Sequence, residues 1–462
     1  MAVLPAELIK LIFNQYSPVT TVTSTTPKDT HRTTAAQLYS QHEASLKEYF
    51  VVCSQVCRLW HDLSQPYLFT TLAIPFGTSA PSDLLTILAK LDAYPAPIKW
   101  VHHLRLVMRS PPPQDEYEGC DPQLLRALLY RFELARVVEM VDVVFRVSET
   151  EGYAESLQAD LQTTGTPIEP NNRLEKISFS YPGSDCSPTV DTILYMLKWM
   201  GDVDEVNIEP YYWLHWTTRL TREDLHLIPT AFNVNTLNIV AYYLPDIFLQ
   251  CLRGSRAFQD DAQGLKKLYF KAHGTSDQHL RMLLLPTSLK ELHLDFDSFF
   301  DQGPRGELTP SILADVARLE GHIRDLKHLQ KLTLKVPAKS ISEWDNAWSY
   351  ILREFSVLAM SASSADQPPV LPSLQVVTIM LVLVKGRLRT VLPTLRVVFA
   401  TIDGALVQIP SVERVVIRMG RMTSASEGVG ASADGGTRMT EEHRTWFRQH
   451  MTALDAKGLL DV

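Results

Sequence analysis

The sequence predicts an α/β protein: a short N-terminal helical module followed by an irregular solenoid of parallel strands, with helices on the convex side. Three observations support this fold class. A six-residue pattern, apolar-x-x-apolar-x-apolar, recurs ten times from residue 101 onward, helix-start signals lie between its copies, and most copies alternate apolar with polar residues. A strand and a helix repeated in a constant order indicate stacked units that share one core.

Length and composition agree with a large folded protein. The 462 residues are 45% hydrophobic and 21% charged, close to the averages for soluble globular proteins, which excludes collagen-like, mucin-like and wholly disordered chains. The formal net charge is -8, and no run of five basic residues occurs. Because binding to a phosphate backbone depends on clustered Lys and Arg, we expect no nucleic-acid partner.

The sequence also bears on the compartment. Its five cysteines include no C-x-x-C pair, which suits a reducing environment. The first residues, MAVLPAELIKLIF, lack the features of a signal peptide. The longest apolar stretch, residues 376–384, has nine residues, whereas a membrane-spanning helix needs about 20. We therefore expect no membrane partner and a cytoplasmic or nuclear location.

The N-terminal module, residues 1–75, contains two segments with a helical pattern. LPAELIKLIF at 4–13 has apolar residues at helical spacing, with Pro5 in the first turn. Residues 17–35 are rich in Thr and have no apolar period, so we interpret them as a disordered insertion. The helical pattern returns at residue 37 and ends at PYLF, residues 66–69.

These two segments resemble the F-box family. LPAELIKLIF matches the family's L-P-x-E-L-x-x-x-I-F form, and CSQVCRLWHDL at 53–63 matches its S-x-V-C-R-x-W-x-x-L form. The insertion lengthens the spacer between them, which costs only loop entropy. The resemblance implies a module that binds a Skp-family adaptor protein and, through it, a cullin-RING ubiquitin ligase. The residues that it implies for adaptor contact are Leu4, Pro5, Leu8, Ile9, Ile12, Phe13, Val56 and Trp60.

The size of the module supports a partner independently. About 60 residues provide too little interior to bury this many large apolar side chains, and leftover apolar surface indicates an interaction. We interpret Pro5, Ile9 and Trp60 as contact residues, and Leu46 and Phe50 as part of the module's own core.

The repeat array occupies residues 76–420. Its ten pattern copies begin at residues 101, 138, 174, 203, 234, 265, 289, 329, 374 and 412, with a mean spacing of about 35 residues. Capping side chains before a first-turn proline or acidic residue predict helices between several copies, because such residues satisfy the free N–H groups of a helix start. These helix starts are Asp121 with Pro122, Ser187 with Pro188, Thr309 with Pro310, and Ser342.

Strand chemistry distinguishes a solenoid from a sheet covered on both faces. Strands covered on both faces are almost continuously apolar, whereas KISFS, EVNIE, KLYFK, ELHLD and KLTLK alternate. The pattern is similar to the L-x-x-L-x-L core of leucine-rich repeats over residues 101–417. That resemblance implies a horseshoe whose alternate strand residues line an exposed concave face.

Charges on this exposed face alternate in sign from strand to strand. They are Glu205 and Glu209, then Lys267 and Lys271, then Glu291 and Asp295, then Lys331 and Lys335. Alternation cancels the long-range field that a polyanion needs, which again argues against nucleic acid. Two interpretations remain: a solvated face with unpaired charges, or a polar face that binds a protein.

The C-terminal region breaks the repeat. Residues 421–439 form a low-complexity linker, and residues 440–458 predict a helix that begins at Thr440. Its apolar residues share one side, and we predict that this helix covers apolar surface at the end of the array. A late strand would also expose an unusually apolar row, formed by Val376, Thr378, Met380 and Val382.

No catalytic constellation is found, so we expect no catalytic residue, no metal site and no cofactor. GVGASA at 428–433 formally fits a dinucleotide motif, but it lies in the Ser/Gly/Ala-rich linker. Three scattered histidines, His215, His273 and His293, are interpreted as surface or rim residues. The resemblance to the F-box family therefore implies a ubiquitin-ligase substrate receptor. The alternatives are a leucine-rich-repeat scaffold that assembles no ligase, and an α/β enzyme.

The predicted target-binding residues form an aromatic rim. Tyrosine pairs follow two consecutive strands at the same distance, and two tryptophans follow nearby, so stacking of the units should bring all six together. Large aromatic side chains dominate many binding surfaces. Alternatively, these side chains pack beneath the helices of their own repeat. The residues are Tyr211, Tyr212, Trp213, Trp216, Tyr242 and Tyr243.

Overall fold

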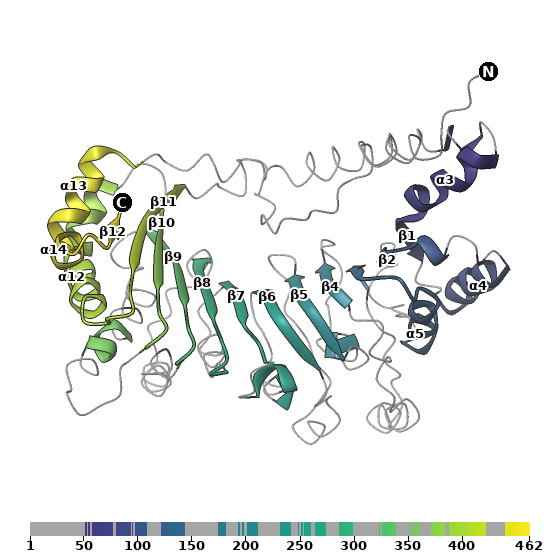
Figure 1. Ribbon diagram of the computed structural model, residues 1–462, viewed down its shortest axis with the longest axis horizontal. Helices are drawn as coiled ribbons and strands as arrows, with labels where there is room; N and C mark the ends of the chain where they lie inside the picture. The colour runs from purple at the N-terminus through teal and green to yellow at the C-terminus, as the bar shows by residue number, and fades with distance from the viewer. Residues whose placement is uncertain are drawn as a thin grey trace, which may run out of the picture. The chain divides into compact units, whose positions relative to one another are not determined.

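The computed structural model describes the protein in two compact units, one containing the described residues up to 143 and the other those from 174 onward. Figure 1 colours the chain by residue number. The described residues are 51–52, 54–55, 58–76, 80–93, 95, 98–108, 122–143, 174–181, 193–194, 196–197, 201–210, 232–241, 248, 251–252, 254–259, 264–273, 286–298, 323, 326–338, 351, 354–359, 371–383, 388–421 and 439–462.

The first unit contains a parallel sheet of strands β1, β2 and β3 in chain order. Helix α3 leads directly into β1, so this part of the predicted N-terminal module lies in the same unit as the first strands. The elements are α3 (Arg58–Phe69), β1 (Thr71–Phe76), α4 (Ala80–Ala93), η1 (Ile98–Trp100), β2 (His103–Met108), α5 (Pro122–Arg131) and β3 (Val137–Val141).

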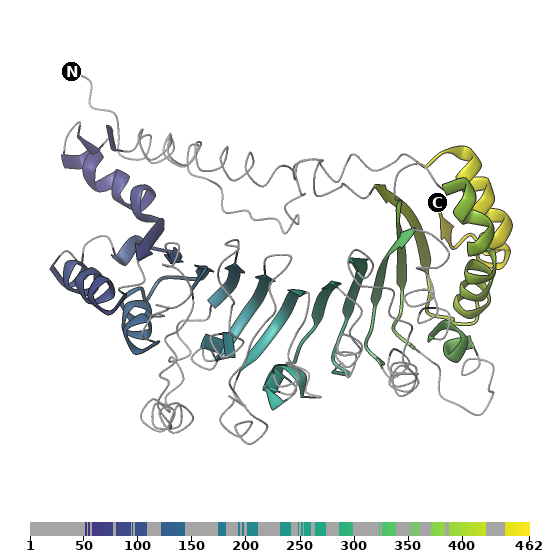
Figure 2. The ribbon, with the colours of Figure 1, turned by 180° about the vertical axis from the view of Figure 1, so that it is seen from behind.

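The second unit contains a parallel sheet whose strands, β4 to β12, also follow chain order; Figure 1 and Figure 2 show them side by side. Three helices near the C-terminus lie beside the last strands in both views. The elements are β4 (Leu174–Tyr181), β5 (Asp202–Pro210), β6 (Asn233–Ala241), η4 (Arg256–Phe258), β7 (Lys267–His273), β8 (Glu291–Ser298), β9 (Lys331–Ala338), β10 (Val376–Leu383), α12 (Leu388–Leu406), β11 (Arg414–Arg421), α13 (Glu441–His450), α14 (Thr452–Ala456) and β12 (Leu460–Asp461).

Each of the ten predicted pattern copies overlaps a strand, so the α/β class and the parallel strands are confirmed, and the arrangement is compatible with a solenoid-like repeat. Alternate side chains of β4 to β11 point to opposite faces, and the inward ones form two apolar rows across the sheet. Because neighbouring strands are in register, an inward apolar residue of one strand lies opposite an inward apolar residue of the next. The first row is Ile177, Val206, Leu237, Leu268, Leu292, Leu332, Val377 and Val415, and all of these side chains are buried.

A tight turn precedes the strands and repeats with the pattern. The N–H of the first apolar residue donates to the carbonyl three residues earlier: Leu329 to Leu326 at 3.0 Å, and Leu374 to Leu371 at 3.1 Å. Leu326 and Leu371 are buried, so the repeating unit has one more apolar position than the predicted pattern.

The second copy is a correction. It was assigned to residues 138–143, but Val138 pairs with Leu104, the fourth residue of the copy before it. The correct frame begins at Ala135, whose N–H donates to the carbonyl of Phe132 at 2.9 Å, the turn that marks the other copies. The six-residue pattern has apolar residues at its three required positions whether it begins at residue 135 or at residue 138. The pattern alone therefore could not distinguish the two starting points.

Two strands were missed. Strand β1 carries a copy of the pattern in FTTLAI, but its first residue, Phe69, ends α3. Strand β12 pairs with β11 through Leu460 and Asp461 only, which is too short for a period. Of the predicted helix starts, Pro122 is the first residue of α5, as expected; Ser187, Thr309 and Ser342 lie outside the described residues.

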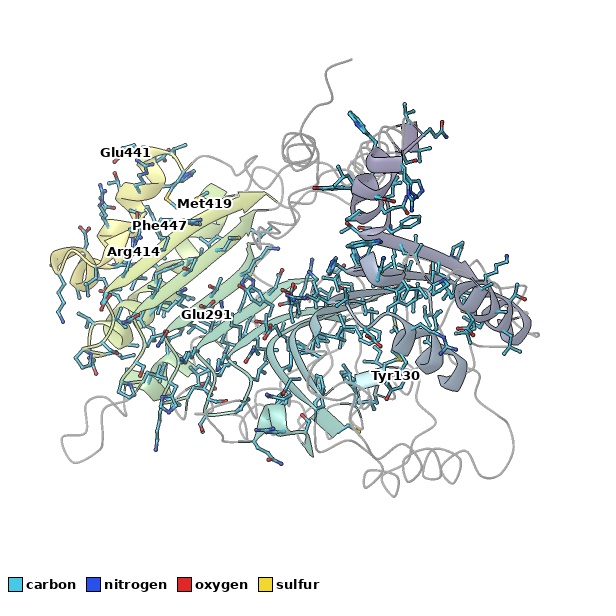
Figure 3. All side chains as sticks on the ribbon, turned by 45° about the vertical axis from the view of Figure 1, so that its right-hand side comes forward. Tyr130, Glu291, Arg414, Met419, Glu441 and Phe447 are labelled. Atoms are coloured by element: carbon cyan, nitrogen blue, oxygen red, sulfur yellow. The ribbon has the colours of Figure 1, made fainter. Side chains whose placement is uncertain are left out.

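The C-terminal helix is divided, contrary to the prediction of one helix over 440–458. Thr440 caps α13 as predicted, but the helix breaks at Met451, and α14 ends at Ala456. Phe447, labelled in Figure 3, is buried and packs edge-to-face on Phe399 of α12, with ring centroids 5.1 Å apart. The two helices therefore cover α12, and β12 adds a strand at the sheet's end.

Candidate functional site

The outward side chains of β4 to β9 form a surface that we call the polar face. In-register pairing arranges them in three rows, because each outward residue lies beside the corresponding residue of the next strand. The first row is Lys176, Glu205, Thr236, Lys267, Glu291 and Lys331; the second is Ser178, Asn207, Asn238, Tyr269, His293 and Thr333; the third has two parts, Ser180 with Glu209, and Val240, Lys271, Asp295 and Lys335.

Charges on the polar face form ion pairs between neighbouring strands. Lys176 Nζ lies 2.9 Å from Glu205 Oε1, and Lys335 Nζ lies 3.0 Å from Asp295 Oδ2. Glu291 bridges two strands, since its Oε1 lies 3.4 Å from Lys267 Nζ and 3.1 Å from Lys331 Nζ. The predicted alternation is confirmed, and these charges are paired, which disfavours a face of unpaired charges. Each exposed pair contributes at most about 1 kcal/mol, so the pairs order the surface more than they stabilise it.

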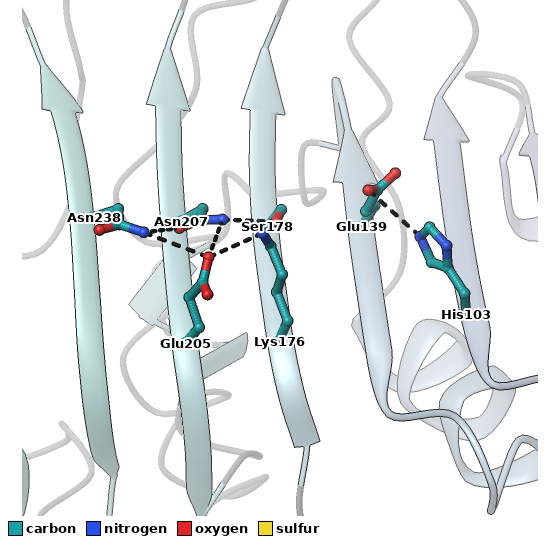
Figure 4. Close-up of polar contacts among 7 residues, drawn as sticks. All are labelled: His103, Glu139, Lys176, Ser178, Glu205, Asn207 and Asn238. Carbon is teal, nitrogen blue, oxygen red and sulfur yellow. Dashed lines mark hydrogen bonds and ion pairs between the residues drawn. The ribbon is translucent and has the colours of Figure 1, made fainter. Parts of the chain in front are cut away.

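An amide network occupies the middle row where β4, β5 and β6 meet (Figure 4). Asn207 is 9% exposed; its Nδ2 donates to Glu205 Oε1 at 2.9 Å and to Ser178 Oγ at 3.4 Å. Asn238 Nδ2 in turn donates to Asn207 Oδ1. Because Glu205 also pairs with Lys176, the network holds five side chains from three strands in one arrangement.

An aromatic pair continues the middle row. The rings of Tyr269 and His293 stack with centroids 5.3 Å apart. Burial lowers the pKa of His293; the carboxylate of Asp295 opposes this effect, and the ammonium of Lys335 adds to it. His293 is partly buried on the polar face, which is a surface position of the kind that the sequence predicted.

The first unit has a smaller polar cluster on its strands. Glu139 of β3 contacts two residues of β2: its Oε1 lies 3.4 Å from His103 Nε2, and its Oε2 lies 3.5 Å from Arg105 Nε (Figure 4 draws the first contact). The alternation of outward polar and inward apolar residues therefore holds in this unit too.

Only one of the predicted adaptor-binding residues can be located. Trp60 lies on α3 and is partly exposed, with contacts to other residues of the chain. The others, Leu4, Pro5, Leu8, Ile9, Ile12, Phe13 and Val56, lie outside the described residues.

The predicted aromatic rim also lies outside the described residues: Tyr211, Tyr212, Trp213, Trp216, Tyr242 and Tyr243. The strands before the tyrosine pairs are described. Ile208 of β5 lies opposite Ile239 of β6, which is the register that the predicted aromatic rim requires. The position of the tyrosines themselves stays a prediction.

Sequence reasoning missed the amide network and the stacked pair. Asn207 and Asn238 occupy the same outward position in consecutive copies, as do Tyr269 and His293 in the next two. Aligning the copies and comparing their fifth residues would have found both features.

The comparisons and searches add few constraints. Neither models of known protein families nor curated proteins match this chain. Within the described ranges, no helix is long and apolar enough to cross a membrane, and no three His, Cys, Asp or Glu side chains are placed to hold a metal ion.

Proposed function

We propose that this chain is the substrate-recognition subunit of a Skp-cullin-F-box type ubiquitin ligase, acting in the cytoplasm or nucleus. Its N-terminal module binds the Skp adaptor, and its repeat surface binds a target protein. The observation that carries the proposal is the pair of segments LPAELIKLIF and CSQVCRLWHDL, in this order before a repeat array.

The array supports the second half of the proposal. Its parallel strands follow one another in chain order, with one apolar and one polar face, as in leucine-rich repeats. The polar face presents side chains held by cross-strand contacts, including the bridge at Glu291. A surface ordered before binding loses little conformational entropy when a partner docks.

The mechanism is proximity, and the chain itself performs no chemistry. Holding a target beside a charged conjugating enzyme makes the transfer of ubiquitin effectively intramolecular, which raises the effective concentration of the acceptor lysine. The residues of this chain then determine which protein is held and in which orientation.

The decisive experiment is recovery of a Skp adaptor with the full chain. Ile9→Asp combined with Trp60→Ala should abolish recovery, because a charge and a cavity replace two apolar contacts. Val397→Asp is the matched control, since Val397 is 68% exposed on α12 of the second unit. Equal recovery with all three chains would refute the F-box assignment.

Deletion of residues 1–75 is a poor substitute for these variants. It would remove β1 almost entirely, and β1 pairs with β2 through residues 71 to 76. Recovery of a target without any Skp adaptor would favour the other candidate function, a leucine-rich-repeat scaffold whose F-box-like module assembles no ligase.

A further inference from the structure

Strand β10 interrupts the pattern of the polar face. Its outward residues Val376, Thr378 and Met380 carry no charge, and the rows of Val376 and Met380 hold cations on both neighbouring strands. Val376 lies between Lys331 of β9 and Arg414 of β11. Met380 lies between Lys335 and Arg418. We call these six charged and apolar residues the β9–β11 patch: Lys331, Lys335, Val376, Met380, Arg414 and Arg418.

The dimensions of the patch follow from sheet geometry. Adjacent strands lie about 4.8 Å apart, so the two columns of cations are separated by about 10 Å. Val376 and Met380 are four residues apart on β10 and therefore lie about 13 Å apart along the strand. An apolar strip therefore runs between two parallel columns of positive charge.

Three of the four cations are exposed, whereas Lys335 is 22% exposed and pairs with Asp295. The side chains of Lys331 and Arg414 are 56% and 59% exposed, and Arg418 is exposed as well. Arg414 pairs with Asp461, and Lys331 shares Glu291 with Lys267. Among the described residues, no carboxylate pairs with Arg418. The patch therefore retains positive charge beside apolar surface.

We propose that the β9–β11 patch binds an amphipathic, acidic helix of a partner protein. Apolar residues along one stripe of that helix contact Val376 and Met380, while carboxylates on its two flanks pair with the cations of β9 and β11. A helix is about 10 Å wide with its side chains, which matches the separation of the cation columns.

Charge and apolarity together select this occupant. A nucleic acid would use the cations but leave the strip of Val376 and Met380 without apolar contacts, and a neutral apolar helix would leave Arg418 without a counter-charge. The proposal deepens the proposed function, because it names the chemical class of the target. Its test needs no adaptor, so the two can fail separately.

The experiment measures fluorescence anisotropy of a labelled peptide of about 15 residues, near the length at which isolated helices form. The peptide carries a leucine stripe flanked by glutamates, and a second peptide has lysine for every glutamate. The full chain is compared with Arg418→Glu and Met380→Asp. The matched controls are Arg396→Glu and Val397→Asp, which change exposed residues of α12.

The glutamate peptide should bind, and Arg418→Glu and Met380→Asp should each weaken binding by roughly tenfold or more, because each places a carboxylate against the peptide. The controls should bind as the wild type does, and raised salt should weaken binding. Melting temperatures identify any variant that is unfolded. If Met380→Asp is unfolded, the binding measured for Arg418→Glu decides the test.

Three results of the peptide titrations would overturn the proposal. They are equal or tighter binding of the lysine peptide, undiminished binding by folded Arg418→Glu, and no binding of the glutamate peptide by the wild type. Displacement of the peptide by a lower concentration of single-stranded RNA would also overturn it, since the patch would then be a general polyanion site.

Discussion

Asp403 of α12 is a buried carboxylate that caps another helix. Its two oxygens accept the N–H groups of Ala453 at 3.0 Å and Leu454 at 2.9 Å, in the first turn of α14. Helix α14 has no capping side chain of its own. Asp403→Ala should lower the free energy of unfolding by about 1–2 kcal/mol, the usual effect of losing a cap.

Chemical denaturation measures this change. Asp403→Asn retains an acceptor oxygen and should lose less than the alanine variant. If Asp403→Ala is as stable as the wild type, the cap does not hold the C-terminal helices on α12.

His293 makes stability depend on pH. Burial lowers its pKa in the folded state below the ordinary value of 6.5, so the unfolded chain binds the proton more tightly. The stability gained from the neutral ring is present above pH 6.5 and is lost as the pH falls through the lowered folded-state pKa. The charged and titratable groups around the ring are Glu291 and Asp295 on its own strand, Lys267, Tyr269 and Lys271 on β7, and Lys331 and Lys335 on β9.

Denaturation midpoints measured above and below pH 6.5 test this prediction. His293→Gln should show a smaller loss of stability on acidification than the wild type, whereas His328→Gln, at an exposed position of the same unit, should not differ from it. An unchanged pH profile for His293→Gln would contradict the prediction.

At the scale of elements, β1 connects the helical module to the sheet. It pairs with β2 along six residue pairs, from Thr71 with His103 to Phe76 with Met108. A chain lacking residues 1–76 would expose the edge of β2 as unpaired N–H and C=O groups, which promote aggregation. A chain lacking residues 1–50 keeps both α3 and β1.

We expect the longer deletion to lower the melting temperature and to shift the protein to larger species in size-exclusion chromatography, and the shorter deletion to do neither. Identical behaviour of the two chains would mean that β1 contributes little to the first unit.

At the scale of the whole molecule, the -8 net charge and the paired charges of the polar face argue against a nucleic-acid partner. Lys267, Glu291 and Lys331 are neighbours in the first row of the polar face and alternate in sign. The distances between their charged atoms, 3.4 and 3.1 Å, are less than the screening length of about 8 Å at physiological salt. The full chain should therefore show no RNA or DNA binding at micromolar concentration in a filter or anisotropy assay. Salt-sensitive micromolar binding would contradict this.

The sequence by itself determined the repeat, the strands and their two faces. Each depends on spacing within a few residues. Leu329, Leu332 and Leu334 are the three apolar positions of one pattern copy, and the alternation of side chains along a strand predicts that Lys331 points outward. The frame at Ala135 was ambiguous because Val138 fits two positions of the pattern, and β12 was too short for a period.

Only the tertiary structure decided which side chains meet. Glu291 bridges Lys267 and Lys331, which lie in different copies of the pattern, and Asp403 reaches α14 from another helix. The same holds for the β9–β11 patch, because the flanking of Val376 by Lys331 and Arg414 depends on strand register. Local periodicity specifies the direction of a side chain along its strand, whereas its neighbours are set by how the copies stack.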